Sequence, residues 1–269
     1  MPILNLSLLQ SWIPFQNYYF SFNGPSWSIS DEMFFYVVFP FLLVLLTKLR
    51  VWGVVLFVGF VLTVYMLLIF ATPDQYANAL FYVNPLLRLV DFMIGMGVYY
   101  CWRKYHPHSP QNNTISTALP TNLKGANTFI EVLAVGFLAI LIICSSSIPQ
   151  IYKYACYYWA PMALIIYIFA RQTGGGYLTR LLSWKPLLIA GEASFGFYMI
   201  HGLAIQVGQP TLTKLSLQTG ITLSESIRFT IIFCTTLITS ILVFRYFETP
   251  VNKWIKRRYN LYYNMHSNS

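Results

Sequence analysis

The sequence predicts an all-α protein, built as a polytopic bundle of about seven transmembrane helices. Of its 269 residues, 57% are hydrophobic, 18% are aromatic and only 9% are charged, whereas a soluble domain carries roughly a quarter charged residues. Residues 51–71 contain no charged side chain at all, and about 20 apolar residues are enough for a helix to cross a bilayer. The composition therefore excludes an ordinary soluble domain and indicates a multi-pass membrane protein.

Apolar segments separated by polar connections mark the expected spans, which are residues 31–49, 51–71, 84–102, 128–148, 154–171, 187–208 and 227–247. The longest polar connection, 103–127, is rich in Asn, Thr, Ser and Pro and is expected to be disordered, or else to dock a partner. The glycine-broken stretch 172–180 lacks a Walker-type lysine, which favours a flexible connection over a phosphate cradle. We expect residues 1–255 to form an N-terminally incomplete transmembrane domain and 256–269 a basic cytoplasmic tail.

The distribution of positive charge predicts the orientation of the chain. The net charge is +9, but the basic residues lie between the apolar segments, so anionic lipid is the expected partner and nucleic acid is not. Twelve lysines and arginines fall on the side of the C-terminal tail, against three on the other side, Lys153, Lys214 and Arg228. Positive loops face the cytoplasm, which predicts a cytoplasmic C-terminus and an outer location for residues 1–30. Such a start is simplest if an odd number of helices precedes Met1.

The four cysteines, Cys101, Cys144, Cys156 and Cys234, lie in or beside apolar segments without the spacing of metal ligands. Cysteine in such surroundings usually acts as a small buried hydrophobe. We therefore expect no metal site.

Ionisable residues occur at similar depth on three of the expected spans. Asp31 and Glu32 stand at the outer end of the first span, Arg88 and Asp91 near the outer end of the third, and His201 in the outer half of the sixth. Each would be costly to expose to lipid. We therefore expect them to face the bundle interior or a wet cavity.

Each of these residues also has a purely structural interpretation. Arg88 and Asp91, three residues apart on a helix, could simply neutralise each other. Ser30 could cap the first helix, with the two acids after it in the first turn. Trp27 could be an interfacial aromatic residue, and the histidine a hydrogen-bonded structural side chain. Their shared depth is what favours a site.

The residue types suit group transfer to a hydroxyl. A neutral imidazole beside a carboxylate can accept a proton from a hydroxyl group, and an arginine can hold an anion or stabilise an oxyanion. Aromatic side chains near the same depth offer flat faces for a sugar ring; they are Tyr18, Tyr19, Trp27, Tyr36 and Tyr198. The same set would equally suit the substrate site of a transporter.

Four motifs resemble the acyltransferase type 3 family of integral membrane O-acyltransferases. "SWSISDEMFFYVVFP" resembles the family signature "WSLSVEEQFY…P" through Trp27, Ser28, Ser30, Glu32, Phe35, Tyr36 and Pro40. "RLVDFMIGM" is similar to its Arg-x-x-x-Phe-x-x-Gly element through Arg88, Phe92 and Gly95. "GEASFGFYMIHGLAI" resembles its Ser-Tyr-x-x-Tyr-x-x-His helix through Ser194, Tyr198 and His201, and "RYFETPVNKW" its closing Glu-x-Pro through Glu248 and Pro250.

The resemblance implies a bundle of about ten helices that moves an acyl group, usually acetyl, from cytoplasmic acyl-CoA to a sugar hydroxyl on the other side of the membrane. Typical acceptors would be O-antigen, exopolysaccharide or related glycans, including lipid-linked saccharides. It implies acyl-CoA as a donor substrate, no tightly bound cofactor, and the bacterial inner membrane as location.

The candidate site residues are chosen by the family motifs and by the similar depth of the ionisable residues in the membrane. His201, Glu32 and Arg88 are the expected catalytic residues, and the expected substrate-binding residues are Trp27, Ser28, Tyr36, Asp91, Ser194 and Tyr198. The chain departs from the family at Met33 and Phe34, which replace a glutamate and a glutamine of the signature. The arginine and histidine of the family's first helix have no match before the signature. A non-enzymatic carrier, a scaffold or a catalytically incomplete remnant of the family is therefore the alternative.

Overall fold

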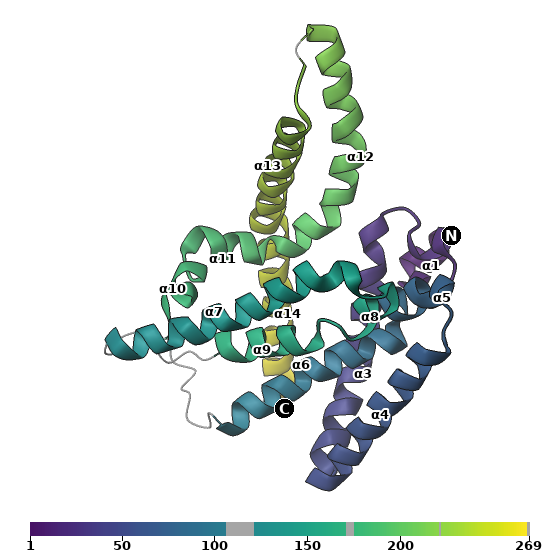
Figure 1. Cartoon of the computed structure of the whole chain (residues 1–269), viewed down its shortest axis with the longest axis vertical. Helices are drawn as coiled ribbons and strands as arrows, with labels where there is room; N and C mark the ends of the chain where they lie inside the picture. The colour runs from purple at the N-terminus through teal and green to yellow at the C-terminus, as the bar shows by residue number, and fades with distance from the viewer. Residues whose placement is uncertain (106–120, 171–174, 221, 268–269) are drawn as a thin grey trace. The chain divides into compact units, whose positions relative to one another are not determined.

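The computed structural model describes residues 1–105, 121–170, 175–220 and 222–267 (Figure 1). These residues form helices and no strand, which confirms the predicted all-α class. They divide into two compact units, Met1–Leu181 and Leu182–Ser269. Each unit is described by itself.

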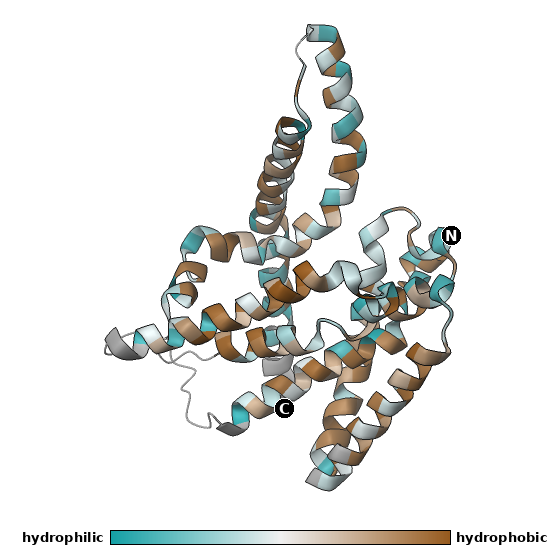
Figure 2. Ribbon diagram, in the orientation of Figure 1, coloured by the Kyte–Doolittle hydropathy of each residue, from teal (hydrophilic) through white to brown (hydrophobic). Residues whose placement is uncertain are grey.

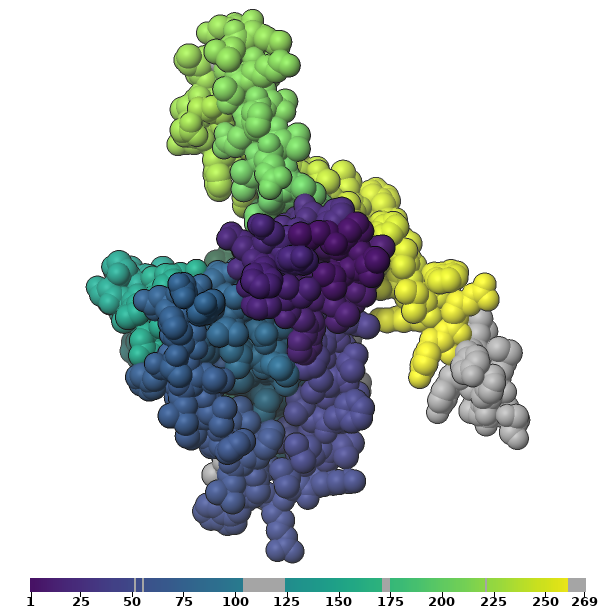
Figure 3. Space-filling model, turned by 90° about the vertical axis from the view of Figure 1, so that its right-hand side faces the viewer, coloured from purple at the N-terminus to yellow at the C-terminus, as the bar shows by residue number. Residues whose placement is uncertain are grey.

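Short helices open the first unit, and long ones follow. Its α-helices are α1 (Pro2–Leu6), α2 (Gln16–Tyr19), α3 (Trp27–Lys48), α4 (Val51–Ala71), α5 (Asp74–Ala77), α6 (Pro85–Tyr105), α7 (Thr121–Cys144), α8 (Gln150–Ala155), α9 (Trp159–Phe169) and α10 (Tyr177–Leu182). Three 3₁₀ turns, η1 (Gln10–Trp12), η2 (Gly24–Ser26) and η4 (Ser145–Ser147), and a π-helical segment, η3 (Asn78–Val83), join them. Figure 3 shows the first residues, in dark purple, gathered against one end of the blue helices that follow.

The second unit contains α11 (Lys185–Glu192), α12 (Ser194–Thr219), α13 (Glu225–Val243), the π-helical segment η5 (Phe244–Glu248) and α14 (Thr249–Ser267). Helices α12 and α13 pack along each other. A Cβ added at Gly208 would lie 2.9 Å from Cγ1 of Ile232. Glycine is therefore what lets the two helices approach closely at this point.

Four described helices are long and apolar enough to cross a membrane, Gly24–Lys48, Trp52–Ala71, Lys124–Ser147 and Glu225–Asn260. Two bent pairs bring the number to six, Asp74–Val83 with Pro85–Arg103 (52°) and Lys185–Glu192 with Ser194–Thr219 (64°). The apolar bands of these helices are visible in Figure 2. Large apolar side chains such as Trp52 and Phe70, each 77% exposed, point outward. The chain is thus a polytopic membrane protein, as predicted.

Two expected spans differ in detail from the structure. The described part of residues 154–171 is divided between the end of α8 and α9. The 11 residues of α9 cover about 16 Å at 1.5 Å per residue. Pro161 lies in the first turn of α9; in an unbroken helix its ring would clash with the carbonyl of the preceding turn. The expected span 187–208 is broken between Glu192 and Ser194. The expected polar loop 103–127 falls largely outside the described residues, and its two ends belong to α6 and α7.

Two apolar clusters hold the first unit together around the start of α6. Tyr65 of α4, Phe81 of η3, Val90 of α6 and Ile151 of α8 are buried in the larger cluster. The rings of Tyr65 and Phe81 lie 5.4 Å apart. This packing fixes α8 against the segment that leads into α6.

The glycine-broken connection before α10 is anchored in its described part. The buried carboxylate of Glu131 accepts hydrogen bonds from the backbone N–H of Gly176 (2.7 Å), Leu178 (3.2 Å) and Thr179 (3.2 Å). A Cβ added at Gly176 would lie 2.5 Å from the backbone nitrogen of Thr128. The close approach of the two segments therefore requires glycine here. The expectation of a flexible connection did not foresee this anchor; residues 171–174 lie outside the described residues.

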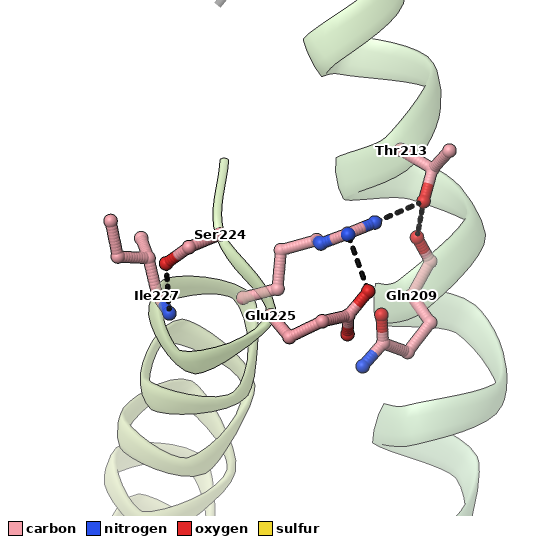
Figure 4. Close-up of polar contacts among 6 residues, drawn as sticks. Gln209, Thr213, Ser224, Glu225 and Ile227 are labelled. Atoms are coloured by element: carbon pink, nitrogen blue, oxygen red, sulfur yellow. Dashed lines mark hydrogen bonds and ion pairs between the residues drawn. The ribbon is translucent and has the colours of Figure 1, made fainter. Parts of the chain in front are cut away.

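A polar network joins α12 and α13 near the turn between them (Figure 4). Arg228 donates to Oγ1 of Thr213 (3.0 Å) and to Oε1 of Glu225 (2.6 Å). The hydroxyl of Thr213 in turn donates to the carbonyl of Gln209 (2.9 Å). Ser224 caps α13 by accepting from the N–H of Ile227 (3.4 Å). The network fixes the register of the two helices.

Candidate functional site

The first unit contains a cavity of about 590 Å³ between η3, α6, α8 and α9. This volume falls in the range of small-molecule sites. Its polar and aromatic lining residues include Arg88, Asp91, Gln150, Lys153, Tyr154 and Trp159. The cavity therefore combines both charges of the expected third span with residues from α8 and α9.

Arg88 and Asp91 form the central ion pair of this cavity. Nη1 of Arg88 lies 2.5 Å from Oδ2 of Asp91, and the side chains are 31% and 28% exposed. The indole N–H of Trp159 donates to the other oxygen of Asp91. The pairing expected from the three-residue spacing is thus confirmed. The carboxylate of Asp91 thus links α6 to α9 and holds the guanidinium of Arg88 on one side.

The Arg-x-x-x-Phe-x-x-Gly element distributes its residues along one side of α6. Arg88 and Gly95 line the cavity, and no atom lies within 4 Å of a Cβ added at Gly95. Phe92 stacks on Phe35 of α3, with ring centroids 5.3 Å apart, and meets Phe39 edge-on at 6.0 Å. The phenylalanine therefore packs α6 against α3, while the arginine and the glycine shape the cavity.

The Trp-Ser-x-Ser segment is mainly structural. Helix α3 begins at Trp27, not at Asp31, so the interpretation of Ser30 as N-cap is wrong. Trp27 is buried, at 6% exposure, and its ring lies 4.8 Å from that of Tyr82, which lines the cavity. It is therefore a packing residue behind the cavity wall rather than an exposed interfacial aromatic.

The serines of this segment bond to nearby backbone. Ser28 donates to the carbonyl of Pro25 (3.0 Å). Ser30 donates to the carbonyl of Leu8 (2.6 Å) and accepts from the hydroxyl of Ser11 (2.6 Å). These bonds fasten the N-terminal segment to α3. Serine was the residue type needed, because a short hydroxyl can both donate and accept.

The two adjacent acids of α3 occupy different environments. Asp31 is 3% exposed, and neither of its carboxylate oxygens accepts a hydrogen bond from the described residues. Ser11 lies beside it, but the hydroxyl proton of that serine is directed to Ser30. Glu32 is partly exposed and, like the 67% exposed Tyr36, is not among the residues that line the cavity. The structure thus buries the acid that stands outside the family signature.

Tyr19 is buried at the end of the first unit where the short helices gather. Its hydroxyl donates to Oδ1 of Asn78 (3.1 Å). Burial raises the pKa of the Tyr19 phenol, with a smaller contribution from Tyr154. The phenol therefore stays protonated at neutral pH and acts as a hydrogen-bond donor that links α2 to η3.

Ser194, Tyr198 and His201 belong to the second unit, and the structure describes them within that unit alone. Ser194 is the first residue of α12. Nδ1 of His201 lies 2.5 Å from the carbonyl oxygen of Tyr198. A carbonyl can only accept, so Nδ1 is the donor of this contact, and Nε2 is the ring nitrogen that this bond leaves unused. The histidine is thus hydrogen-bonded, as the structural interpretation expected, yet keeps one nitrogen that can accept a proton.

The sequence reasoning missed the contribution of α8 and the start of α9. Gln150, Lys153, Tyr154 and Trp159 all line the cavity, whereas the sequence pattern indicates only the membrane orientation of Lys153. A signal was present: the segment "QIYKYACYYW" places one lysine among six aromatic and amide side chains within a long uncharged region. Such a concentration of polar aromatics is unusual for a bare membrane span.

Within the described residues, no group of three or more His, Cys, Asp or Glu side chains could hold a metal ion. The cysteines are free thiols, and Cys101, Cys144 and Cys234 are exposed while Cys156 is half-buried. The expectation that they are buried was therefore wrong for three of them. The three lie on helices that can span a membrane, where an exposed apolar side chain meets lipid instead of a protein core.

Comparisons with known proteins agree with the motifs. The chain is 28% identical over 216 residues to the acyltransferase MdmB of Streptomyces mycarofaciens, covering 76% of this chain and 51% of that protein. It is 26% identical over 255 residues to the peptidoglycan O-acetyltransferase OatA of Listeria monocytogenes, covering 90% and 38%. A putative peptidoglycan O-acetyltransferase of Bacillus subtilis, YrhL, is 25% identical over 205 residues, covering 72% and 31%.

The chain spans about half the length of these curated relatives, or less. No solved structure gives a significant match. The sequence profile of the acyltransferase domain family matches residues 2–245, which include the Arg88–Asp91 pair, the signature segment on α3 and the histidine of α12. This chain therefore belongs to the acyltransferase family.

Proposed function

We propose that the protein transfers an acyl group, acetyl in the simplest case, from acyl-CoA to a hydroxyl of a cell-surface or secreted glycan. The observation that carries the proposal is the Arg88–Asp91–Trp159 arrangement in a cavity of about 590 Å³, on a motif of the family. Support also comes from the relatives, two of which are named as peptidoglycan O-acetyltransferases, one of them putatively. The protein would thus modify a polysaccharide by O-acetylation of its hydroxyl groups.

The reaction requires three things of its site. The acceptor oxygen attacks the thioester carbonyl carbon, the carbon–sulfur bond breaks, and the hydroxyl proton ends on the sulfur of the released CoA. The carbonyl oxygen gains negative charge on the way. Arg88 would stabilise that charge, because a preorganised guanidinium is an effective oxyanion partner. Asp91 and Trp159 would hold it in place.

The other candidate residues keep the roles that the motifs suggest. Nε2 of His201 would accept a proton, since Nδ1 is the nitrogen engaged with the carbonyl of Tyr198. Glu32 would complete the catalytic set. Tyr36, Ser194 and Tyr198 are kept as proposed acceptor contacts. Trp27, packed behind the cavity wall, and Ser28, bonded to the carbonyl of Pro25, would support the site instead. Each of these assignments rests on its own motif position.

We further propose that the chain lies in the bacterial inner membrane as a multi-pass protein with its C-terminus in the cytoplasm. The excess of positive charge on the side of the tail supports this orientation. The cytoplasmic lysines and arginines would meet the phosphates of CoA. The cavity would then open toward the outer side, where the glycan acceptor is.

Acetyl transfer from labelled acetyl-CoA, measured in membranes that carry the full-length protein, tests the proposal. Removing one oxyanion-stabilising donor typically costs about 10²–10³ in rate, so we expect Arg88→Lys to lose most of the transfer. Arg228→Lys is the matched control, because Arg228 forms the same kind of three-residue ion pair, with Glu225 at 2.6 Å, and is not among the residues that line the cavity. Equal rates for both variants would refute the proposal. Substrate flux into proteoliposomes without acyl-CoA turnover would instead favour a carrier.

A further inference from the structure

The charges of the cavity do not balance. Arg88, Asp91 and Lys153 are its charged lining residues. Asp91 is paired with Arg88 and also bonded by the Trp159 indole. Lys153 makes no salt bridge with any residue that the structure describes. One positive charge is therefore left facing the cavity.

The surrounding sequence offers Lys153 no carboxylate. There is no acidic residue anywhere between 132 and 191, so neither α8 nor α9 can neutralise it. Asp74 on the neighbouring α5 is exposed and makes no salt bridge with it. Lys153 is itself half-buried, and a partly desolvated ammonium without a counter-charge is unfavourable.

The position of Lys153 is fixed by the packing of α8. Ile151 and Ala155, four residues apart, are buried on the inner face of this helix. Gln150, Lys153, Tyr154 and Ala155 itself line the cavity. Lys153 therefore lines the cavity from a helix that is anchored in the core through Ile151 and Ala155.

We propose that Lys153 binds an anionic group, a carboxylate or a phosphate, on the saccharide acceptor and so makes this site prefer acidic over neutral glycans. The inference rests on the proposed function and deepens it. Aromatic side chains beside Lys153, those of Tyr82, Tyr154 and Tyr158, also line the cavity and can flank a sugar ring. The ring would lie against them while its acidic substituent meets the ammonium.

Binding to the purified full-length protein tests the inference without requiring catalysis. The probes are methyl β-glucoside, which is neutral, methyl β-glucuronide, which adds a carboxylate to the same ring, and glucose 1-phosphate, which adds a phosphate. Affinities are measured by saturation-transfer NMR in nanodiscs of neutral lipid. A charge-assisted hydrogen bond corresponds to a factor of roughly ten or more in affinity.

We expect the wild type to bind at least one acidic probe about tenfold more tightly than the glucoside. Lys153→Gln should remove that preference and leave glucoside binding unchanged. Lys153→Arg should largely retain the preference for the acidic probe. Lys214→Gln is the matched control, since Lys214 lies on the same predicted side of the membrane but is exposed on α12. The arm that responds, carboxylate or phosphate, identifies the anion.

Three outcomes overturn the inference. One is a wild type that binds the three probes alike, and another is a Lys153→Gln variant that loses all three equally. The third is an effect of Lys153→Gln confined to nanodiscs of anionic lipid, which would make the lysine a lipid headgroup contact.

The transfer assay separates failure of this inference from failure of the proposed function. Loss of transfer in Arg88→Lys, together with equal effects of Lys153→Gln on acidic and neutral acceptors, leaves the function standing and removes the inference. Charge-selective binding without acetyl transfer in any membrane preparation removes the proposed function and leaves the anion-binding role of Lys153 standing.

Discussion

Trp159 of α9 donates its indole N–H to the same carboxylate of Asp91 that pairs with Arg88 on α6. Asp91 and Trp159 are 68 residues apart in the chain. The bond places one neutral donor and one cation on the two oxygens of a single carboxylate. It makes the orientation of the arginine depend on a residue from a different helix, and this dependence can be tested.

Trp159→Phe should reduce acyl transfer about tenfold while the fold is retained. The phenyl ring can still pack against Tyr65, whose ring lies 5.0 Å from that of Trp159, but the hydrogen bond to Asp91 is lost, and hydrogen bonds to charged groups contribute about 1.5–3 kcal/mol. Initial rates and thermal unfolding of the purified protein are the measurements. Trp52→Phe, at a 77% exposed position, is the control and should match the wild type.

Asp31→Asn should raise the free energy of unfolding, by about 1–3 kcal/mol, because a buried carboxylate that accepts no hydrogen bond from the described residues is costly. Thermal unfolding in detergent measures the change. Asp74→Asn, at an exposed position, should have little effect. A less stable Asp31→Asn protein would show instead that the carboxylate has a favourable role in the folded state.

Gly176→Ala should destabilise the first unit by about 1–3 kcal/mol, the usual cost of overpacking. The added methyl would lie 2.5 Å from the backbone nitrogen of Thr128 and 2.6 Å from Oε2 of Glu131, which would break the anchor of α10. Gly136→Ala on α7, where nothing lies within 4 Å, is the matched glycine control. It should be neutral or stabilising, since alanine favours helix. Equal unfolding temperatures for the two variants would contradict the close approach seen at Gly176.

Gly208→Ala should loosen the α12–α13 pair, because the new Cβ would lie 2.9 Å from Cγ1 of Ile232. Ile232→Ala removes that atom, so the double variant should recover part of the stability lost in Gly208→Ala. A double-mutant cycle on thermal unfolding measures the coupling. Strictly additive effects would mean that the two residues do not meet.

His201→Ala and Glu32→Ala, at matched expression, should each lower acetyl transfer at least tenfold, as expected for removal of an acid–base residue. His201→Gln should not restore the rate, because an amide cannot accept the hydroxyl proton. Full activity in both alanine variants would remove these residues from the catalytic set and leave Arg88 as its remaining member.

Local patterns in the sequence were reliable guides to local structure. Residues 51–71 form α4 as expected, and the pairing of Arg88 with Asp91 follows from helical spacing alone. The start of α3 was placed one turn too late, because an N-cap serine before two acids is a common pattern, whereas here Trp27 begins the helix.

Local sequence patterns do not predict contacts between segments that are far apart in the chain. Nothing within the α6 sequence indicates that Trp159 will reach Asp91. The burial of Asp31, in place of its neighbour Glu32, depends on how the N-terminal segment folds back on α3 through Ser11 and Ser30. One wall of the cavity is α8, whose six residues are too few to form a stable helix alone and depend on the surrounding core.

Helix α8 both packs in the apolar core and lines the cavity, and some of its residues do only one of the two. Ile151 and Ala155 hold α8 in the apolar core, whereas Gln150 and Lys153 line the cavity and lie outside that core cluster, so exchanges at positions 150 and 153 would alter the cavity wall without removing a core contact. Related chains could thus diversify in the glycans they accept by changing one short helix while the Arg88–Asp91 pair stays the same. For protein engineering, α8 is accordingly the cassette in which to build libraries for new acceptors.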